Sequence, residues 1–392
     1  MNVLPEMAPA ALGVEPSSHT AAVTVTVSLQ ASTAAEVQVG TVPPAARSKR
    51  IVSINPLEYP AWDSLLAVHP GSSFFHGSAW ARVLHETYGH RPAYFCRFAD
   101  GQLEEVLPIM EVSSLWRGRR GISLPFTDFC SPLNPARRDQ NDLYGLAMQR
   151  GQARSWRYIE CRGSDYGWLS ARPSLAFYGH VIELGAGEKV LFKSLNGDER
   201  SAIRKAERER VKVDFCSTLE SVQTFYALHN LTRRRHGLPP QPFRFFENIA
   251  RHVLAKGHGF AAIARLEQRP VAAAIFFHQG RRAIHKFGAS DYAFQRLRPN
   301  NLLMWEAMKR YAATGYEQLL MGRTSIANEG LRRFKLGFGA REERISYYKY
   351  DFVKRDFVTD VDRAEGWFNS VFRLMPPPLL RLAGQMLYPH LS

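Results

Sequence analysis

The sequence contains few cysteines and no long apolar run. Its 392 residues include four cysteines: Cys96, Cys130, Cys161 and Cys216. None lies at the short spacing of a zinc-binding or disulfide framework, so we expect no metal site and no disulfides. No apolar run is long enough to cross a bilayer, and the N-terminus lacks the basic and apolar segments of a signal peptide. These absences predict a cytoplasmic protein.

Basic residues and aromatic rings are absent from the beginning of the chain. Residues 1–46 have three glutamates but no lysine or arginine, and residues 1–48 have no Phe, Trp or Tyr. This composition predicts a disordered leader over 1–48. The remaining chain carries 51 basic and 33 acidic residues, a balance of +18. Such a charge favours an anionic partner, either a phosphate-bearing substrate, RNA or an acidic membrane surface, although a generally basic protein is the alternative.

Two segments of similar plan follow the leader. In residues 51–184 a helix over 78–89 ends at Gly89, and a hairpin over 93–112 turns at Asp100-Gly101, before a strand that runs into a Pro-rich loop. Residues 185–352 predict two helices, three antiparallel strands, a long helix, a strand, a short helix and a last strand. These elements lie at 220–237, 243–259, 260–290, 300–315, 316–322, 328–337 and 343–353.

The pattern predicts an α+β fold with two tandem modules, each a mixed, largely antiparallel sheet flanked by helices. We expect Asn300 to cap the start of the long helix and Gly315 to end it. The tail, residues 353–392, is apolar and basic with three consecutive prolines. It predicts a helical pair that docks on the body, and the alternative is peripheral contact with a membrane surface.

Several segments together resemble the FemABX family, whose members contain two GNAT-type acyltransferase modules. They are "ERSAIRKAERERVKV", "LTRRRHGLPPQP", the helix after "RPNN", "GYEQLLMGR" and "RRFKLGFGA". In the first module, "YGHRPAYF" and "LPIMEVSSLWRGRRGISLPFTDF" are similar to the branch linked to exopolysaccharide and exosortase systems. The resemblance covers about residues 51–352. It implies that the two modules, 51–184 and 185–352, are GNAT-like.

The resemblance also implies a reaction. FemABX members form amide bonds, typically by moving an amino acid from aminoacyl-tRNA to an amine of a nucleotide-linked or lipid-linked cell-wall precursor, whereas other GNAT-type proteins use acyl-CoA. The donor is then a co-substrate, and no permanently bound cofactor is expected. The expected partners are a phosphate-bearing or lipid-linked acceptor and tRNA, but not DNA.

Attack of an amine on an ester or thioester requires proximity, charge stabilisation of the oxyanion and removal of a proton. Lys335 is the candidate for the catalytic cation, because in the matching position some FemABX members use a lysine to steady the developing charge. The resemblance gives Phe334 a role beside the terminal adenosine of the donor. A solvated helix lysine and a core phenylalanine are the alternatives, and for Phe334 the core position is favoured.

Other candidates surround the long helix. Arg298, Asn300 and Asn301 lie at its start, where free N–H groups favour anions. No Gly-rich loop, the usual pyrophosphate cradle of acyl-CoA-binding GNAT enzymes, precedes it. Arg323 is expected to follow a strand and to point toward the cleft. Asp291 and Asp128 are candidates for amine binding or proton acceptance.

Three arginines repeat every four residues in "ERSAIRKAERER": Arg200, Arg204 and Arg208. Like charges at this spacing weaken a helix slightly. One interpretation is a phosphate-facing surface for the acceptor diphosphate or a tRNA acceptor stem, and the other is a solvated basic face.

Three functions remain open at this point. The first is an N-acyltransferase that forms an amide on an amine of a cell-wall or exopolysaccharide precursor, with aminoacyl-tRNA or a related acyl donor. The second is an acyl-CoA-dependent GNAT N-acetyltransferase. The third is a non-catalytic RNA-binding or scaffold protein on a GNAT frame.

Overall fold

The structure is a computed structural model that describes residues 50–69, 71–133, 141–163, 171–360, 362 and 367–390. The expected disordered leader, 1–48, lies outside these residues. The described residues belong to one compact unit.

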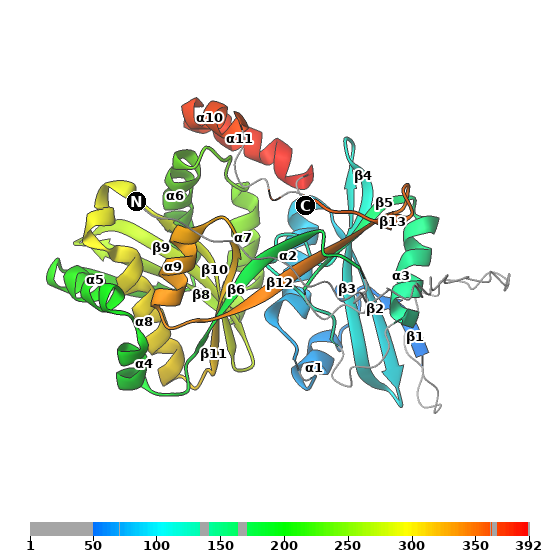
Figure 1. Ribbon diagram of the computed structural model, residues 1–392, viewed down its shortest axis with the longest axis horizontal. Helices are drawn as coiled ribbons and strands as arrows, with labels where there is room; N and C mark the ends of the chain where they lie inside the picture. The colour runs from blue at the N-terminus through cyan, green and yellow to red at the C-terminus, as the bar shows by residue number, and fades with distance from the viewer. Residues whose placement is uncertain are drawn as a thin grey trace, which may run out of the picture. The chain divides into compact units, whose positions relative to one another are not determined.

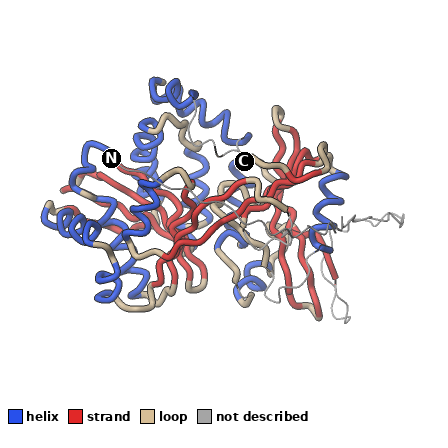
Figure 2. The backbone as a smooth tube through the Cα atoms, viewed as in Figure 1, coloured by secondary structure: helices blue, strands red, loops and turns tan. Residues whose placement is uncertain are grey.

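Thirteen strands among the described residues join into one continuous sheet (Figure 2). The strands before residue 184 are β1 (Arg50–Ile54), β2 (Arg91–Ala99), β3 (Gln102–Ser114), β4 (Gly118–Ile122), β5 (Trp156–Arg162) and β6 (Leu175–Glu183). Those after it are β7 (Val211–Cys216), β8 (Gly259–Leu266), β9 (Arg269–Gln279), β10 (Arg282–Ser290), β11 (Gln318–Ser325), β12 (Arg341–Asp351) and β13 (Asp356–Phe357). The strand order is β1-β2-β3-β4-β5-β12-β6-β11-β10-β9-β8-β7, with β13 on β12.

Most neighbouring strands are antiparallel, and the β4–β5 and β10–β11 pairs are parallel. The helices flank the sheet (Figure 1). They are α1 (Trp62–Ala67), α2 (Ser78–Tyr88), α3 (Asn141–Ala153), α4 (Glu188–Ser194), α5 (Gly197–Arg208), α6 (Leu219–Arg235), α7 (Phe243–His252), α8 (Pro299–Ala313), α9 (Glu329–Gly337), α10 (Trp367–Leu374) and α11 (Pro377–Leu387). This arrangement confirms the predicted α+β class with mixed, largely antiparallel pairing.

Strand β9 is buried on both faces and separates two hydrophobic cores. Ile275 and Phe277 enter the core shared with α2, α6 and α7, whereas Phe276 enters the core beneath α5 and α8. The alternation follows from the two-residue period of a strand. Helix α5 contributes only Ile203 and Ala206 to the second core, as its sparse apolar face predicts.

Two strands connect the halves of the sheet. Strand β6 precedes residue 184 yet pairs with β11 and β12, and β12 pairs with both β6 and β5. Figure 1 shows β12 running across the middle of the molecule between them. Strands on the two sides of the predicted domain boundary, between residues 184 and 185, therefore share hydrogen bonds in one sheet. The boundary stays a prediction from the sequence.

Local signals in the sequence give several element ends correctly. Gly89 ends α2 with φ 71°, and Asp100 and Gly101 form the β2–β3 turn with φ 50° and 76°. The expected Asn300 cap is wrong. Arg298, with φ 59°, holds the cap position of α8, and Pro299 begins the helix. A proline fits the first helical position because that residue has no intrahelical N–H bond to lose.

The C-terminal helices dock on the body, as the tail's composition predicts. Tyr388 Oη accepts a hydrogen bond from Arg233 at 2.6 Å. A Cβ on Gly384 would lie 2.0 Å from the Pro240 carbonyl oxygen, so only glycine permits this approach of α11. None of the helices in the described part of the chain has the length and apolarity needed to cross a membrane.

Candidate functional site

The parallel strands β10 and β11 separate after a short paired segment. Their register runs from Arg282↔Gln318 to Ile284↔Leu320. At this point β10 shifts register against β9 between His285 and Phe287, and β11 shifts against β6 between Leu320 and Arg323. Such irregularities bend strands and expose backbone groups. An opening between the two strands is the result, and Gly322, with φ 70°, lies on its β11 side.

Lys335 of helix α9 fills the β11 side of this opening. Its side chain is buried, with a residue exposure of 4%. Its Nζ donates to the carbonyl oxygens of Gly322 at 2.9 Å and Arg323 at 3.1 Å. Both carbonyls lie beyond the last β10–β11 pair, so the ammonium replaces the missing strand as their donor. A lysine has three N–H donors, which leaves one for a substrate.

Burial lowers the pKa of Lys335 to about 8, and the negative charge of Asp128 opposes part of this shift. Helix α9 holds the lysine in place through a tight contact at its end. A Cβ on Gly337 would lie 2.8 Å from Glu199 Cγ, and the Gly337 carbonyl accepts from Asn196 N at 2.9 Å. At neutral pH Lys335 is therefore a fixed cation in a buried position.

Asp128 comes from the loop after β4 and faces the same opening. Its Oδ2 lies 3.4 Å from Lys286 Nζ of β10, and a Cβ on Gly322 would lie 2.8 Å from the same oxygen. Burial by itself raises the pKa of Asp128, but the charges of Lys286, Arg323 and Lys335 outweigh it and lower that pKa. The carboxylate therefore stays ionised. Of the two aspartates that the sequence indicates, this one reaches Lys335's surroundings.

Asp291 has a local structural role. Its Oδ1 accepts from Ala293 N at 3.1 Å and caps a 3-10 turn, and its Oδ2 pairs with Arg269 at 3.1 Å. Phe334 packs on Phe338, with ring centroids 5.1 Å apart, against the core beneath α8. This contact agrees with the core position favoured for Phe334.

Arg323 lies inside β11 rather than after it, so its expected place at a strand end is wrong. The strand continues to Ser325 because β6 pairs with it again past the register shift. The guanidinium stacks 4.3 Å from the Phe177 ring centroid and donates to Tyr347 Oη at 2.8 Å. Tyr347 Oη in turn donates to the Asp128 carbonyl oxygen. Arg323 thus positions the Asp128 loop through Tyr347.

The three arginines of α5 have different environments. Arg200 donates to the carbonyl oxygens of Lys193 and Leu195, at the end of α4. Arg204 is exposed and stacks 5.5 Å from the Phe192 ring centroid. Arg208 lines a cavity of about 530 Å³ between α5 and the start of α8, together with Lys205, Arg298 and Asn301. Of the three arginines, Arg208 therefore meets the α8 candidates.

The start of α8 offers few free donors. Pro299 has no N–H, and the N–H groups of Asn301 and Leu302 both donate to the Arg298 carbonyl oxygen, at 3.1 and 3.4 Å. The Asn301 amide donates to Glu199, whose pKa burial raises. The backbone N–H of Asn300 is the one donor of this turn that does not donate to the Arg298 carbonyl oxygen. Positive charge at this site comes from the side chains of Lys205, Arg208 and Arg298 rather than from the backbone, and Asp198 and Glu199 line the same cavity.

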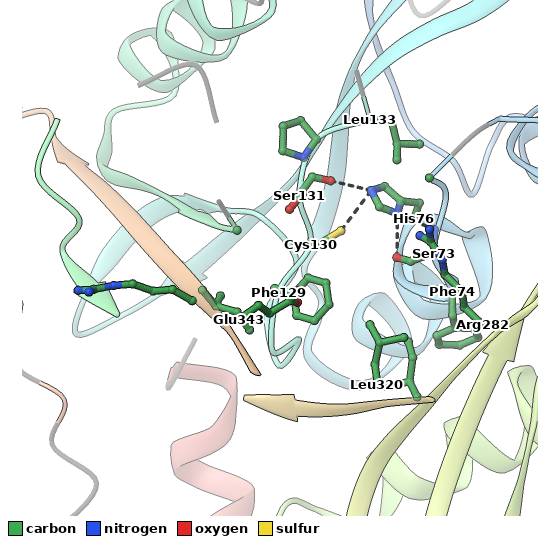
Figure 3. A pocket seen from close by; sticks show the side chains of 16 residues that line it. Ser73, Phe74, His76, Phe129, Cys130, Ser131, Leu133, Arg282, Leu320 and Glu343 are labelled. Carbon is green, nitrogen blue, oxygen red and sulfur yellow. Dashed lines mark hydrogen bonds between the residues drawn. The ribbon is translucent and has the colours of Figure 1, made fainter. Parts of the chain in front are cut away.

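A cavity of about 470 Å³ lies where the Asp128 loop meets the paired ends of β10 and β11 (Figure 3). Phe129, Ile284 and Leu320 line it. Phe129 follows Asp128, whereas Ile284 and Leu320 lie two residues before Lys286 and Gly322. The cavity is open to solvent on one side and has both polar and apolar walls. It adjoins the loop that carries Asp128, but neither Asp128 nor Lys335 is among the residues that line it.

A cysteine and a histidine also meet in this cavity, which their sequence separation did not reveal. Cys130 Sγ lies 3.5 Å from His76 Nε2, and the same nitrogen lies 2.9 Å from the Ser131 carbonyl oxygen (Figure 3). Burial raises the pKa of Cys130 well above its ordinary value and lowers the pKa of His76 to about 4. The thiol stays protonated, and His76 Nε2–H donates to the Ser131 carbonyl oxygen rather than accepting the thiol proton. This pair is therefore not an activated nucleophile.

Lys286 and Tyr347 also belong to the site but were not singled out in the sequence. The signal for Lys286 is a lysine within the otherwise apolar "AIHKFGAS" strand. The ring of His285, which precedes Lys286, packs 5.2 Å from the Phe276 ring centroid. Burial and the nearby Lys335 lower its pKa to about 4, so it is neutral.

Comparisons with known proteins agree with this architecture. Residues 194–349 match the family described as "Acetyltransferase (GNAT) domain". The crystal structure of FemX superposes with a TM-score of 0.63 at 15% identity, covering 78% of this chain and 98% of that chain. No curated protein matches the sequence significantly.

Two further structures have the same fold. A tandem GNAT protein from the clavulanic acid biosynthesis pathway has a TM-score of 0.50 at 9% identity and covers 78% of this chain and 98% of its own. L-PGS from Bacillus licheniformis has a TM-score of 0.50 at 11% identity, and the match covers 86% of this chain and 98% of L-PGS. The chain therefore has the same tandem GNAT fold as FemX, and its residues 194–349 match the GNAT acetyltransferase domain model.

Proposed function

We propose that the protein is an N-acyltransferase that joins the acyl group of an ester-linked donor to an amine. The observation that carries this proposal is the buried Lys335 ammonium at the separation of β10 and β11, with Asp128 across the opening. Three cations, Lys286, Arg323 and Lys335, surround one carboxylate here. Such a preorganised positive field stabilises charge that develops on a carbonyl oxygen.

The reaction needs no covalent enzyme intermediate. The neutral amine nitrogen attacks the carbonyl carbon of the donor and the C–N bond forms. The C–O ester bond then breaks, and one N–H proton passes through solvent to the leaving oxygen, which departs as a hydroxyl. Lys335 stabilises the oxyanion of the tetrahedral intermediate. Asp128, which is ionised, holds the incoming ammonium, and its proton is lost to solvent before attack. A carboxylate with a lowered pKa suits cation binding better than proton abstraction near pH 7.

Aminoacyl-tRNA is the proposed donor, and the proposed acceptor is a phosphate-bearing or lipid-linked precursor of cell wall or exported polysaccharide. The likeness of the fold to FemX and the sequence resemblance described above support this choice. The cavity beside Arg208 and Arg298 would hold phosphate through side chains.

Acyl-CoA is the alternative donor, and the GNAT family match over 194–349 favours it. The start of α8 argues against it, because a pyrophosphate cradle relies on free backbone N–H groups and most of those here are absent or engaged. Titration calorimetry with acetyl-CoA and with adenine nucleotides separates the donors. We expect acetyl-CoA to bind no better than free ADP, and tight, selective acetyl-CoA binding would establish the alternative.

Activity itself is tested by mass spectrometry of amine acceptors incubated with charged tRNA or acetyl-CoA. Lys335→Met keeps the side-chain length and removes the charge, so it should reduce acyl transfer about a hundredfold. Val190→Ser on exposed α4 is the matched control and should transfer normally. Failure of the wild-type protein with every donor would favour the scaffold function.

A further inference from the structure

Helices α10 and α11 expose apolar side chains on the face opposite their docking contacts. Leu380 and Gly384 of α11 face the body, whereas Leu379, Leu382 and Met386 are more than half exposed. The exposed three recur at helical spacing and form one apolar stripe. Leu374 at the end of α10 is 84% exposed. A folded protein rarely leaves such a stripe without a partner.

The tip of the β3–β4 hairpin continues this apolar surface. Leu115 is 94% and Trp116 is 63% exposed. The Trp116 ring centroid lies 4.7 Å from that of His390, and Arg120 Nη2 donates to the His390 carbonyl oxygen at 2.8 Å. The hairpin tip therefore adjoins the end of the tail. We call the exposed faces of α10 and α11 together with residues 115–119 the tail–hairpin surface.

The charges of the tail–hairpin surface are all positive. Residues 112–122 and 367–390 contain no aspartate or glutamate, while Arg117, Arg119, Arg373 and Arg381 are exposed. Apolar side chains, a tryptophan and flanking arginines are the pattern of segments that lie in the interface of an anionic bilayer.

A groove beside α11 adds a place for a lipid. It has a volume of about 620 Å³, and its walls include Tyr226, Phe243, Arg381 and Leu382. The Arg381 guanidinium can pair with a phosphate while the aromatic and leucine side chains contact an acyl chain. We propose that the tail–hairpin surface binds the surface of an anionic phospholipid bilayer, independently of the reaction proposed above.

A second copy of the chain is a less suitable occupant. A two-fold interface would place the same arginines of both copies together, and the protein already carries a net charge of +15. A bilayer that contains phosphatidylglycerol supplies both the apolar phase and the opposite charge.

Vesicle flotation with the full-length protein tests the proposal. The vesicles are phosphatidylcholine alone and phosphatidylcholine with phosphatidylglycerol, at low and high salt. We expect binding to the anionic vesicles that weakens as salt rises. Trp116→Ser/Leu382→Ser/Met386→Ser should weaken it at least about tenfold, because each residue loses apolar burial. Arg373→Glu/Arg381→Glu should weaken it by a similar factor at low salt.

The control is Val190→Ser/Lys193→Glu on α4, which makes the same kinds of change on exposed residues elsewhere. It should float as the wild-type protein does, and circular dichroism confirms that all variants are folded. The proposal is overturned if the wild-type protein does not bind anionic vesicles, or if the triple variant binds them as the wild-type protein does. It is also overturned if sedimentation shows that the wild-type protein is a dimer and the triple variant a monomer. In the last case the surface is an interface between copies.

Discussion

Asp128 and Lys335 lie more than 200 residues apart in the chain and act on one opening in the sheet. Their charges are coupled, because each shifts the pKa of the other toward its ionised form. Both residues are candidates from the sequence, whereas their relative geometry is visible only in the fold. Lys286, which pairs with Asp128, escaped notice because a lysine in a strand is normally exposed, and only the fold shows that this one is buried.

Asp128→Asn should raise the KM for the amine acceptor about tenfold, because a charge-assisted hydrogen bond to the ammonium is lost. It should also destabilise the protein by roughly 3–5 kcal/mol, since the buried Lys286 loses the carboxylate it pairs with. Steady-state kinetics and urea unfolding measure the two effects. The double variant Asp128→Asn/Lys286→Met should regain much of the stability that Asp128→Asn loses, but its KM for the amine acceptor should stay raised. Recovery of both would show that Asp128 serves only the fold.

At the scale of elements, helix α5 shows that a sequence pattern can predict an element without predicting the contacts of its side chains. The spacing of Arg200, Arg204 and Arg208 correctly predicts a helix, but it does not show what each side chain contacts. Arg200 satisfies carbonyls at the end of α4, and Arg208 reaches the cavity at α8. Likewise, Asn300 resembled a cap because the left-handed backbone at Arg298 cannot be read from the sequence.

These positions lead to different expected kinetics. Arg208→Ala/Arg298→Ala should raise the KM for the phosphate-bearing substrate and flatten its dependence on salt, because each phosphate contact contributes to the salt slope. Arg204→Ala, which removes an exposed arginine from the same helix, is the control and should change the KM little. Arg200→Ala should lower the melting temperature instead. An unchanged KM for the double variant at low salt would contradict the proposed phosphate site.

For the whole molecule, the shared sheet is the feature that sequence reasoning missed. The order of helices and strands in each half follows from local signals, and the α+β class follows from that order. The exchange of β6 and β12 between the halves depends on pairing across more than 130 residues, as between Gln318 and Glu183 or Tyr347 and Arg162. No local sequence pattern predicts it.

This shared sheet should make the two halves unfold together. Separating them would leave the β5 edge without β12, and unpaired buried backbone groups are costly. In urea we expect one transition that coincides for tryptophan fluorescence and far-ultraviolet circular dichroism. Five of the seven tryptophans precede residue 184, so fluorescence reports mainly the first half. Two separated transitions would show independent modules.

The pH dependence of turnover tests the role of Lys335 most directly. Its pKa of about 8 lies below the ordinary value of 10.5, so the cation is lost as the pH rises through about 8. If the ammonium stabilises the oxyanion, the ratio of wild-type to Lys335→Arg kcat should fall above about pH 8, because the arginine charge does not titrate there. The ratio removes the rise in rate that deprotonation of the acceptor amine gives to both proteins. A ratio that stays constant or rises through pH 8 would contradict the account.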